Sequence, residues 1–262
     1  MTDIRAAADI IACGRRSRAP LELLATDIAP KTESDGYLIQ DALHGLLAPD
    51  FGVRVGYKIG CTSSVMQQYL GIPHPCAGGV FAKGVHDNGV SLASDDFIRV
   101  GVECEIAVRL ARDLAPSQAP FTPDTVAQAI EAYLPAIEIV DDRYLDWQSL
   151  GAPTLVADDF FAAGCVLGKP VARSAAPDLH KVVGRAFING VEAGQGTGAD
   201  VLGHPHNALA WLANHLAGSD KHLRAGEIVL TGSLVKTIWL KPGEDGVMMD
   251  LRGLGSVGAT FG

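Results

Sequence analysis

The sequence predicts an α+β fold, with a small helical N-terminal part over residues 1–52 and a larger β-rich part over residues 53–262. The first part carries apolar residues at helical spacing. The second consists mainly of short runs of β-branched and aromatic residues separated by Gly, Pro and Asp turns. The regular alternation of strands and helices that a doubly wound sheet requires is missing. Because the residue pattern changes from helical to strand-like without a linker, we expect the two parts to form one compact unit.

Helices are predicted at two places in the N-terminal part. Residues 6–11 form one apolar run, and residues 34–47 space Tyr37, Leu38 and Leu46 along a largely apolar face. Prolines are predicted to mark the boundaries of elements in this part of the chain. They are Pro20, Pro30 and Pro49.

Strands dominate the β-rich part, and a few helices interrupt them. These helices are predicted over residues 64–70, 123–133 and 205–216, the last with Pro205 in its first turn, where proline is well tolerated. The glycine-rich residues 194–200 do not match a phosphate-binding loop or a dinucleotide fingerprint, and they are predicted to form a turn. The predicted strands are residues 53–60, 97–110, 134–142, 165–171, 185–191, 227–240 and 255–261.

Composition excludes several classes of protein. The formal net charge is −9, and no Lys/Arg cluster is present, so nucleic acids and anionic membranes are not expected partners. No window approaches about 18 consecutive apolar residues, and the N-terminus lacks the order of a signal peptide. The five cysteines have no CxxC spacing, which favours reduced thiols in a cytoplasm.

Two glutamates share one face of a predicted strand. In residues 100–110, period-2 alternation turns Val102 and Cys104 one way and Glu103 and Glu105 the other. The side-chain roots of residues i and i+2 on a strand lie only about 7 Å apart. Like charges this close repel unless a positive charge lies between them. The pair therefore predicts a bound cation.

Glu138 is an isolated acid inside an apolar strand, between Ile137 and Ile139. An unpaired carboxylate is costly to bury. Three carboxylates from two strands would form a hard oxygen site that suits Mg²⁺ or Mn²⁺. The alternative is that Glu103 and Glu105 form a solvated strand face while Glu138 pairs with an arginine.

Lys58 is a second charged residue inside an apolar strand, bounded by Gly56 and Gly60. Burial lowers the pKa of a lysine, and nearby carboxylates raise it. Such a lysine can hold a substrate carboxylate or move a proton. The alternative is a strand lysine that extends its ammonium group into solvent.

Other polar motifs carry weaker signals. His204 and His206 flank Pro205 and are predicted to cap a helix or line a turn rather than to bind a metal. Ser233 lacks the GxSxG context of a nucleophile elbow, so no catalytic triad is predicted.

Taken in order, several segments resemble the fumarylacetoacetate hydrolase superfamily, in particular the branch of 2-keto-4-pentenoate hydratases and 4-oxalocrotonate decarboxylases. The ordered set runs over nearly the whole chain. The matching pieces are GYKIGCTSSVMQQYLGI (56–72), GVECEIAVRL (101–110), LPAIEIVDDRY (134–144), VADDFFAAGCVLG (156–168), GTGADVLGHPHNALAWLANHLA (196–217), LTGSLVKTIWLKPGE (230–244) and LGSVGATF (254–261).

The resemblance implies a mixed, rolled β-sheet, a homo-oligomer and a divalent cation, Mg²⁺ or Mn²⁺. It places the metal ligands at Glu103, Glu105 and Glu138 and the active-site lysine at Lys58, which makes these four the candidate catalytic residues. The implied activity is the addition of water to a 2-hydroxy-2,4-dienoate, giving a 4-hydroxy-2-oxo acid, in the breakdown of aromatic-type compounds. The alternatives are a decarboxylase or an acylpyruvate-type C–C hydrolase with the same metal site, and a degenerate, non-catalytic binding protein.

Two stretches depart from the pattern of this branch. Its members often carry a Pro-Asp-Phe-Gly stretch, but residues 74–81 read HPCAGGVF here, so Cys76 replaces the usual aspartate. They also tend to carry Asp-Asn-Ala-Ser-Ser, which residues 158–162 replace with a sequence that has no hydroxyl group. These stretches are expected to contact the distal end of the substrate and to favour an apolar tail. The candidate substrate contacts are Lys58, Cys76, Ala77, Phe161, Ala162 and Ser233.

Overall fold

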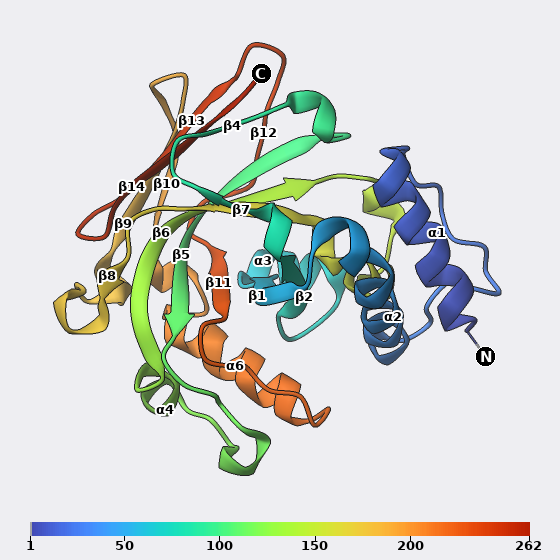
Figure 1. Cartoon of the computed structure of the whole chain (residues 1–262), viewed down its shortest axis with the longest axis horizontal. Helices are drawn as coiled ribbons and strands as arrows, with labels where there is room; N and C mark the ends of the chain where they lie inside the picture. The colour runs from blue at the N-terminus through green and yellow to red at the C-terminus, as the bar shows by residue number, and fades with distance from the viewer. Residues whose placement is uncertain (1) are drawn as a thin grey trace.

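The computed structural model describes residues 2–262 and combines a small helical part with a larger, strand-rich part (Figure 1). The α+β prediction is therefore confirmed. The longer helices are α1 (Ile4–Ser17), α2 (Glu33–Phe51), α3 (Ser64–Leu70), α4 (Pro123–Ala127), α5 (Ala152–Ala157) and α6 (Pro205–Ala217). Helices α1 and α2 pack side by side at one end of the molecule.

Side chains define the start of both N-terminal helices. Asp3 accepts a hydrogen bond from Ala6 N (3.0 Å) at the start of α1. At the start of α2, Asp35 N donates to Thr32 Oγ1 and Thr32 N donates to Asp35 Oδ2, both at 3.1 Å. The expected break at Pro49 is wrong, since α2 continues to Phe51. Pro49 lies in the last turn, where the helix forgoes only the hydrogen bond that proline cannot donate.

The first sheet is mixed and carries the candidate site. Pairing is parallel between β1 and β11 and between β7 and β3, and antiparallel between the other neighbours on the main path. The order of its strands is β2 (Cys76–Phe81), β1 (Arg54–Gly60), β11 (Ile228–Ser233), β5 (Val100–Leu110), β6 (Ile130–Asp141), β7 (Ala162–Leu167) and β3 (Val85–Asp87), with β12 (Ile238–Trp239) added to β5 and β8 (Val171–Ala172) added to β6.

The first sheet is also rolled, because segments far apart in its strand order come into contact. Strands β2 and β7, which are far apart in the strand order, contact each other directly. A Cβ atom on Gly78 of β2 would lie 2.7 Å from the carbonyl oxygen of Asp159, just before β7. Only glycine permits backbones to approach this closely. The rolled sheet implied by the resemblance is confirmed.

A second sheet covers one face of the first. Its strands are β10 (Val191–Thr197), β9 (Val183–Ile188), β13 (Gly246–Leu251), β14 (Gly255–Phe261) and β4 (Val90–Leu92), in that order. In Figure 1 most of this sheet lies at the opposite end of the molecule from α1 and α2. Val102 and Ile106 of β5 share a core with Leu209 of α6 and Met249 of β13. Inside the roll, a smaller apolar cluster contains Ala107, Ala136 and Leu230.

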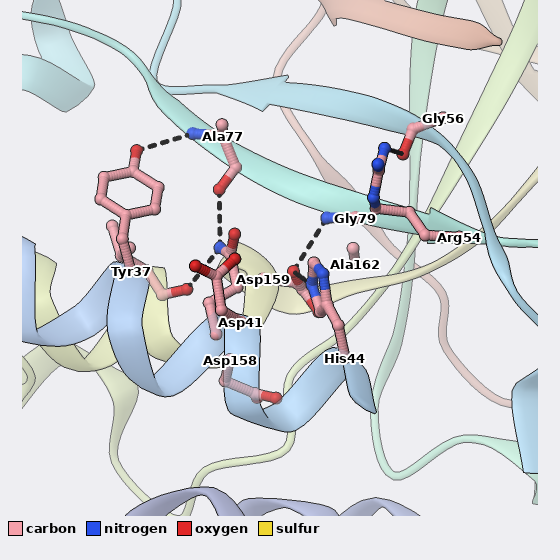
Figure 2. A network of polar contacts seen from close by, with 12 residues as sticks. Tyr37, Asp41, His44, Arg54, Gly56, Ala77, Gly79, Asp158, Asp159 and Ala162 are labelled. Carbon is pink, nitrogen blue, oxygen red and sulfur yellow. Dashed lines mark hydrogen bonds and ion pairs between the residues drawn. The ribbon is translucent and has the colours of Figure 1, made fainter. Parts of the chain in front are cut away.

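Side chains cover the free edge of β2. Ala77 N donates to Tyr37 Oη (3.1 Å), and Gln40 Nε2 donates to Ala77 O (2.9 Å). Two residues further along, Gly79 N donates to Asp159 Oδ1 (2.8 Å), as Figure 2 shows. The backbone groups that an edge strand normally leaves unpaired are thus bonded to α2 and to residue 159.

Several predicted elements differ from those observed. The helix predicted over residues 123–133 ends at Ala127, and β6 begins at Ile130 because the following residues pair with β5. Part of the predicted turn at 194–200 is wrong, since residues up to Thr197 belong to β10 and pair with β9. The long strand predicted at 227–240 is interrupted between Ser233 and Ile238. Long-range pairing decides the structure of the first two segments.

The remaining structural observations concern membrane-spanning helices and cysteines. No helix within residues 2–262 is long and apolar enough to cross a membrane. All five cysteines are free thiols, and Cys13 is the exposed one among them.

Candidate metal centre and active site

Glu103, Glu105 and Glu138 converge inside the rolled sheet. Glu103 lies directly opposite Glu138 in the pairing of β5 with β6, and Glu105 lies two residues further along the same face. Carboxylate oxygens of the three residues lie within 4.8 Å of one another. Glu105 is 0% exposed and Glu138 is 1% exposed. Glu103 is half-buried and Glu105 is buried, so the two do not form a solvated strand face, and Glu138 pairs with Lys58 instead of an arginine.

Protein partners satisfy only some of the carboxylate oxygens. Thr237 Oγ1 donates to Glu103 Oε1, and Gly232 N donates to Glu105 Oε2 (2.9 Å). Lys58 Nζ lies 2.8 Å from Glu138 Oε1 and forms an ion pair with it. Within residues 2–262, Glu105 Oε1 and Glu138 Oε2 have no hydrogen-bond partner. Buried acceptors without a partner are costly, and a cation between the carboxylates would satisfy them.

The charges of this cluster are not balanced by the protein alone. Burial raises the pKa of Glu103 to about 7, and the charge of Glu138 contributes to the rise. Burial, followed by the charges of Glu138 and Glu103, raises the pKa of Glu105 well above its usual value. Burial lowers the pKa of Lys58, but attraction to Glu138 and Glu103 outweighs it, so the net pKa is raised. One ammonium group faces three carboxylates, and this donor set fits a hard divalent cation.

We expect MgCl₂ or MnCl₂ to raise the melting temperature of the metal-free protein. A ligand at 100 times its Kd stabilises the folded state by about 2.7 kcal/mol, which corresponds to about 5–10 °C for a chain of this size. Thermal unfolding with increasing metal concentration measures the shift. Glu105→Gln should remove most of it, whereas Glu131→Gln, an exposed glutamate of β6 that pairs with Arg109, should retain it. Equal shifts in both variants would place the cation elsewhere.

Lys58 reaches the cluster from β1, and Phe160 covers it. A Cβ atom on Gly60 would lie 3.2 Å from Phe160 Cδ1 and 3.5 Å from Lys58 Nζ. The glycine on the same strand face therefore makes room for the aromatic ring. The ring centroid of Phe160 lies 5.6 Å from Lys58 Nζ, close enough for a cation–π interaction. The side chain of Lys58 is only 3% exposed, so the solvent-extended lysine is excluded.

The structure brings part of the predicted substrate-contact set near Lys58. Cys76 pairs with Gly60 across β1 and β2, so its side chain lies on the face that carries Lys58. Ala162 lines a cavity of about 470 Å³ that also reaches Lys58 and Glu138. A cavity of this size falls within the range of small-molecule sites.

Two of the other predicted contacts, Ala77 and Phe161, point elsewhere, whereas Ser233 lies on the face that carries Glu105. Ala77 pairs with Ile59 on the opposite face of β1 and β2, where both join the main core. Phe161 packs edge-on against Trp147, with ring centroids 5.7 Å apart. Ser233 lies opposite Glu105, but its hydroxyl donates to Val235 O (2.7 Å) within its own turn. Contact of these three residues with a substrate stays a prediction.

Sequence reasoning missed several residues around the site. Gly232, within β11, and Thr237, after it, donate hydrogen bonds to the carboxylates, and no local pattern identifies them. Asp158 and Asp159 are both 0% exposed and bind Arg15, which lies 143 and 144 positions away in the chain. No spacing rule finds contacts of that range.

The two histidines have structural roles, as predicted. His204 Nδ1 accepts a hydrogen bond from His206 N (3.0 Å) at the start of α6. His206 Nε2 lies 2.8 Å from Tyr133 Oη.

Comparison with known families identifies the strand-rich part. Residues 82–261 match the family described as fumarylacetoacetate (FAA) hydrolase C-terminal. This range includes all three clustered glutamates. It does not include Lys58, Arg15 or the N-terminal helices.

Full-length relatives have consistent names. The chain is 35% identical to a 2-keto-4-pentenoate hydratase of Burkholderia vietnamiensis, over 94% of this chain and 91% of the relative. It is 37% identical to a 2-hydroxyhexa-2,4-dienoate hydratase of Comamonas testosteroni, again over 94% and 91% of the two chains.

The same fold occurs in a solved enzyme with bound metal. The 4-oxalocrotonate decarboxylase of Pseudomonas putida G7, complexed with magnesium and adipate, superposes with a TM-score of 0.92 at 26% identity, covering 98% of this chain and 97% of that chain. A second structure of that decarboxylase, with calcium and acetate, has a TM-score of 0.89. The family match, the relatives and the superposition agree with the resemblance seen in the sequence. This chain belongs to the fumarylacetoacetate hydrolase family.

Proposed function

We propose that this protein is a divalent-metal-dependent hydratase that adds water to a 2-hydroxy-2,4-dienoate. The observation that carries the proposal is the convergence of Glu103, Glu105 and Glu138 with Lys58 inside the roll. This arrangement lies in a chain that is 35–37% identical to named dienoate hydratases. The cation is Mg²⁺ or Mn²⁺, because an all-carboxylate site suits these hard ions.

The chain's own residues would hold the metal and orient the substrate. Glu103, Glu105 and Glu138 would bind the cation, and the unpartnered Glu105 Oε1 and Glu138 Oε2 are available for it. A bound cation would supply Lewis-acid stabilisation of negative charge on the 2-oxygen of the substrate. Lys58, next to Glu138, would hold the substrate carboxylate or move a proton. Phe160 limits the access of water to the lysine.

The proposed reaction balances without any oxidant or reductant. The 2-hydroxyl of the dienoate loses its proton, and C5 gains one, so that a 2-oxo-3-enoate forms. Water then adds across the C3–C4 double bond, with its oxygen at C4 and a proton at C3. The product is a 4-hydroxy-2-oxo acid. Lys58 is the group nearest the carboxylates that can carry protons between these positions.

A panel of three substrates tests the proposal. The protein would be incubated with a 2-hydroxy-2,4-dienoate, with 4-oxalocrotonate and with an acylpyruvate, each with and without Mg²⁺. Metal-dependent loss of dienoate absorbance without CO₂ release is the expected result. Failure to turn over any of the three would contradict the proposal and favour the degenerate, non-catalytic alternative. C–C cleavage of the acylpyruvate would instead indicate the hydrolase.

The second candidate activity is decarboxylation. It is favoured by the superposition on the 4-oxalocrotonate decarboxylase with a TM-score of 0.92. The same stabilised enolate would form when the substrate loses CO₂. Hydration remains the preferred proposal because the relatives with higher identity, at 35% and 37%, are hydratases.

We expect a higher kcat/KM for alkyl- or aryl-substituted substrates than for distal dicarboxylates. Phe160 and Ala162 offer neither an acid nor a hydroxyl group near Lys58. The nearby Arg15 and Arg143 are already paired with Asp158, so neither is free to bind a distal carboxylate. Each methylene against an apolar wall is worth about 1–3 kcal/mol, and a missing polar partner costs more. Steady-state kinetics on a matched substrate series measures the ratio, and a preference for the dicarboxylate would contradict this expectation.

The homo-oligomer implied by the resemblance and the cytoplasmic location indicated by the cysteine pattern both stay predictions. Size-exclusion chromatography with light scattering would measure the number of subunits.

A further inference from the structure

Residues 159–161 form a left-handed turn without glycine. The φ angles of Asp159, Phe160 and Phe161 are 53°, 52° and 68°. Residues other than glycine rarely adopt this conformation, and three in succession are strained. Such a turn persists only where its surroundings hold it in place.

Buried ion pairs hold the start of the turn. Arg15 of α1 donates from Nε to Asp158 Oδ1 (2.6 Å) and from Nη2 to Asp159 Oδ2 (3.0 Å). The same Nη2 also donates to Asp158 O (2.8 Å). Arg143 donates from Nε to the other oxygen of Asp158 (2.9 Å). The Arg15 guanidinium therefore spans two successive aspartates, a geometry that lysine could not reproduce.

Asp159 is fixed from a second direction by α2. His44 Nε2 lies 2.6 Å from Asp159 Oδ1, and Gly79 N donates to the same oxygen (2.8 Å), as Figure 2 shows. Burial opposes ionisation of Asp159, but the charges of His44 and Arg15 outweigh it and keep the pKa of this carboxyl below its usual range. Both N-terminal helices therefore bind the side chain of Asp159, α1 through Arg15 and α2 through His44.

The turn determines where Phe160 lies. Its ring sits over Gly60 and approaches Lys58 Nζ, with 5.6 Å between the nitrogen and the ring centroid. If the turn relaxed to ordinary backbone angles, the ring would leave this position and water would reach the ion pair of Lys58 with Glu138. Screening by water weakens such a pair and frees the lysine to move.

We propose that Arg15 and His44 are positioning residues of the active site: by holding the strained turn at Asp159–Phe161, they keep Phe160 over Lys58. The N-terminal helices, which lie outside the family match at residues 82–261, are thereby part of the catalytic unit. The expected loss of turnover rests on the proposed hydratase function. The protection of Lys58 does not, because it follows from geometry alone.

Protection of Lys58 can be measured without turnover. The folded protein would be treated with acetic anhydride in the presence of Mg²⁺, and acetylation of Lys58 would be followed by peptide mass spectrometry. The variants are Arg15→Ala, His44→Gln, Phe160→Ala and the double variant Arg15→Ala/Phe160→Ala. Arg5→Ala is the matched control, because Arg5 lies on the same helix and pairs with the exposed Asp9 at 2.9 Å.

We expect Arg15→Ala and His44→Gln to increase the acetylation rate of Lys58 several-fold and to lower kcat by about 10–100-fold, as misplacement of a reacting group does. Phe160→Ala should give the same increase in acetylation. In the Phe160→Ala background, Arg15→Ala should change the rate by less than about twofold, because both substitutions act through the same ring. Arg5→Ala should behave like the unchanged protein. If Arg15→Ala does not fold, His44→Gln provides the same test, since it leaves the Arg15 contacts in place.

Two results would overturn the proposal. One is a Lys58 that stays protected in folded Arg15→Ala or His44→Gln protein. The other is a double variant whose acetylation rate is the product of the two single effects, because Arg15 would then act independently of Phe160. If the unchanged protein hydrates no dienoate, the proposed function fails, and the acetylation rates still decide whether Arg15 and His44 position Phe160.

Discussion

Glu138→Gln should lower kcat/KM on the order of 1,000-fold while leaving the fold intact. The amide keeps the shape of the side chain but removes one negative ligand from a hard cation. Metal stabilisation of developing charge is worth several kcal/mol, and about 1.4 kcal/mol corresponds to a factor of ten in rate. The metal concentration needed for half-maximal activity should rise as well. Kinetics over a range of Mg²⁺ concentrations, with circular dichroism as a check on folding, measures both effects.

The matched control for this variant is Glu131→Gln. Glu131 lies on the same strand, but its carboxylate is exposed and bonded to Arg109 at 2.9 and 3.0 Å. The control should keep full activity and the same metal dependence. Normal turnover by Glu138→Gln, with unchanged Mg²⁺ dependence, would show that Glu138 is structural.

Lys58→Met should reduce kcat by about 10²–10⁴-fold, the range over which a positioned acid or base contributes. Methionine preserves length and apolar contacts but removes the ammonium group that pairs with Glu138 (2.8 Å). The three carboxylates then lose their nearest positive charge. The metal should still bind, and the stability of the folded protein should depend on it more strongly. Single-turnover kinetics and metal-dependent melting separate the two effects.

Lys181→Met serves as the control for the lysine substitution. Lys181 pairs with Asp178 at 3.0 Å on the surface, and its side chain is 77% exposed. Such exposed pairs contribute little to stability, so activity and melting temperature should be unchanged. If Lys58→Met retained the kcat of the unchanged protein, the lysine would not take part in catalysis.

The metal cluster was the most predictable part of the molecule. The side-chain period of a strand is two, so Glu103 and Glu105 must share a face wherever that strand lies. The cost of burying an unpaired acid marked Glu138. The direct pairing of Glu103 with Glu138 depends on the register of β5 against β6, and no local pattern in the sequence sets that register.

The differences between the predicted and the observed secondary structure have identifiable physical causes. Thr122 and Pro123 give a correct helix start, but Ile130 and the residues after it gain more from pairing with β5 than from extending the helix. The strand β13 is absent from the predicted elements, although the sequence carries a strand signal there. Buried Val247, Met249 and Leu251 alternate with exposed residues. The strand β2 offers no such signal, since glycines occupy positions 78 and 79.

The turn at 159–161 could not have been predicted. Phe160 and Phe161 give no indication of positive φ angles, and the residues that hold the turn come from α1 and α2. Only the folded chain brings Arg15 and His44 together with Asp159. The consequence for the site is that Phe160, and not Phe161, lies over Lys58.

The side chains along the edge of β2 also block this edge from pairing with a strand of another molecule. An uncovered edge strand can recruit an identical strand from another molecule and start an aggregate. Tyr37, Gln40 and Asp159 occupy the backbone groups that such a strand would use. A fragment that begins after α2 would lose Tyr37 and Gln40 and expose this edge in every copy. We therefore expect the N-terminal helices to maintain solubility as well as the shape of the site, and shortened forms of the chain to be poor starting material for crystallisation or engineering.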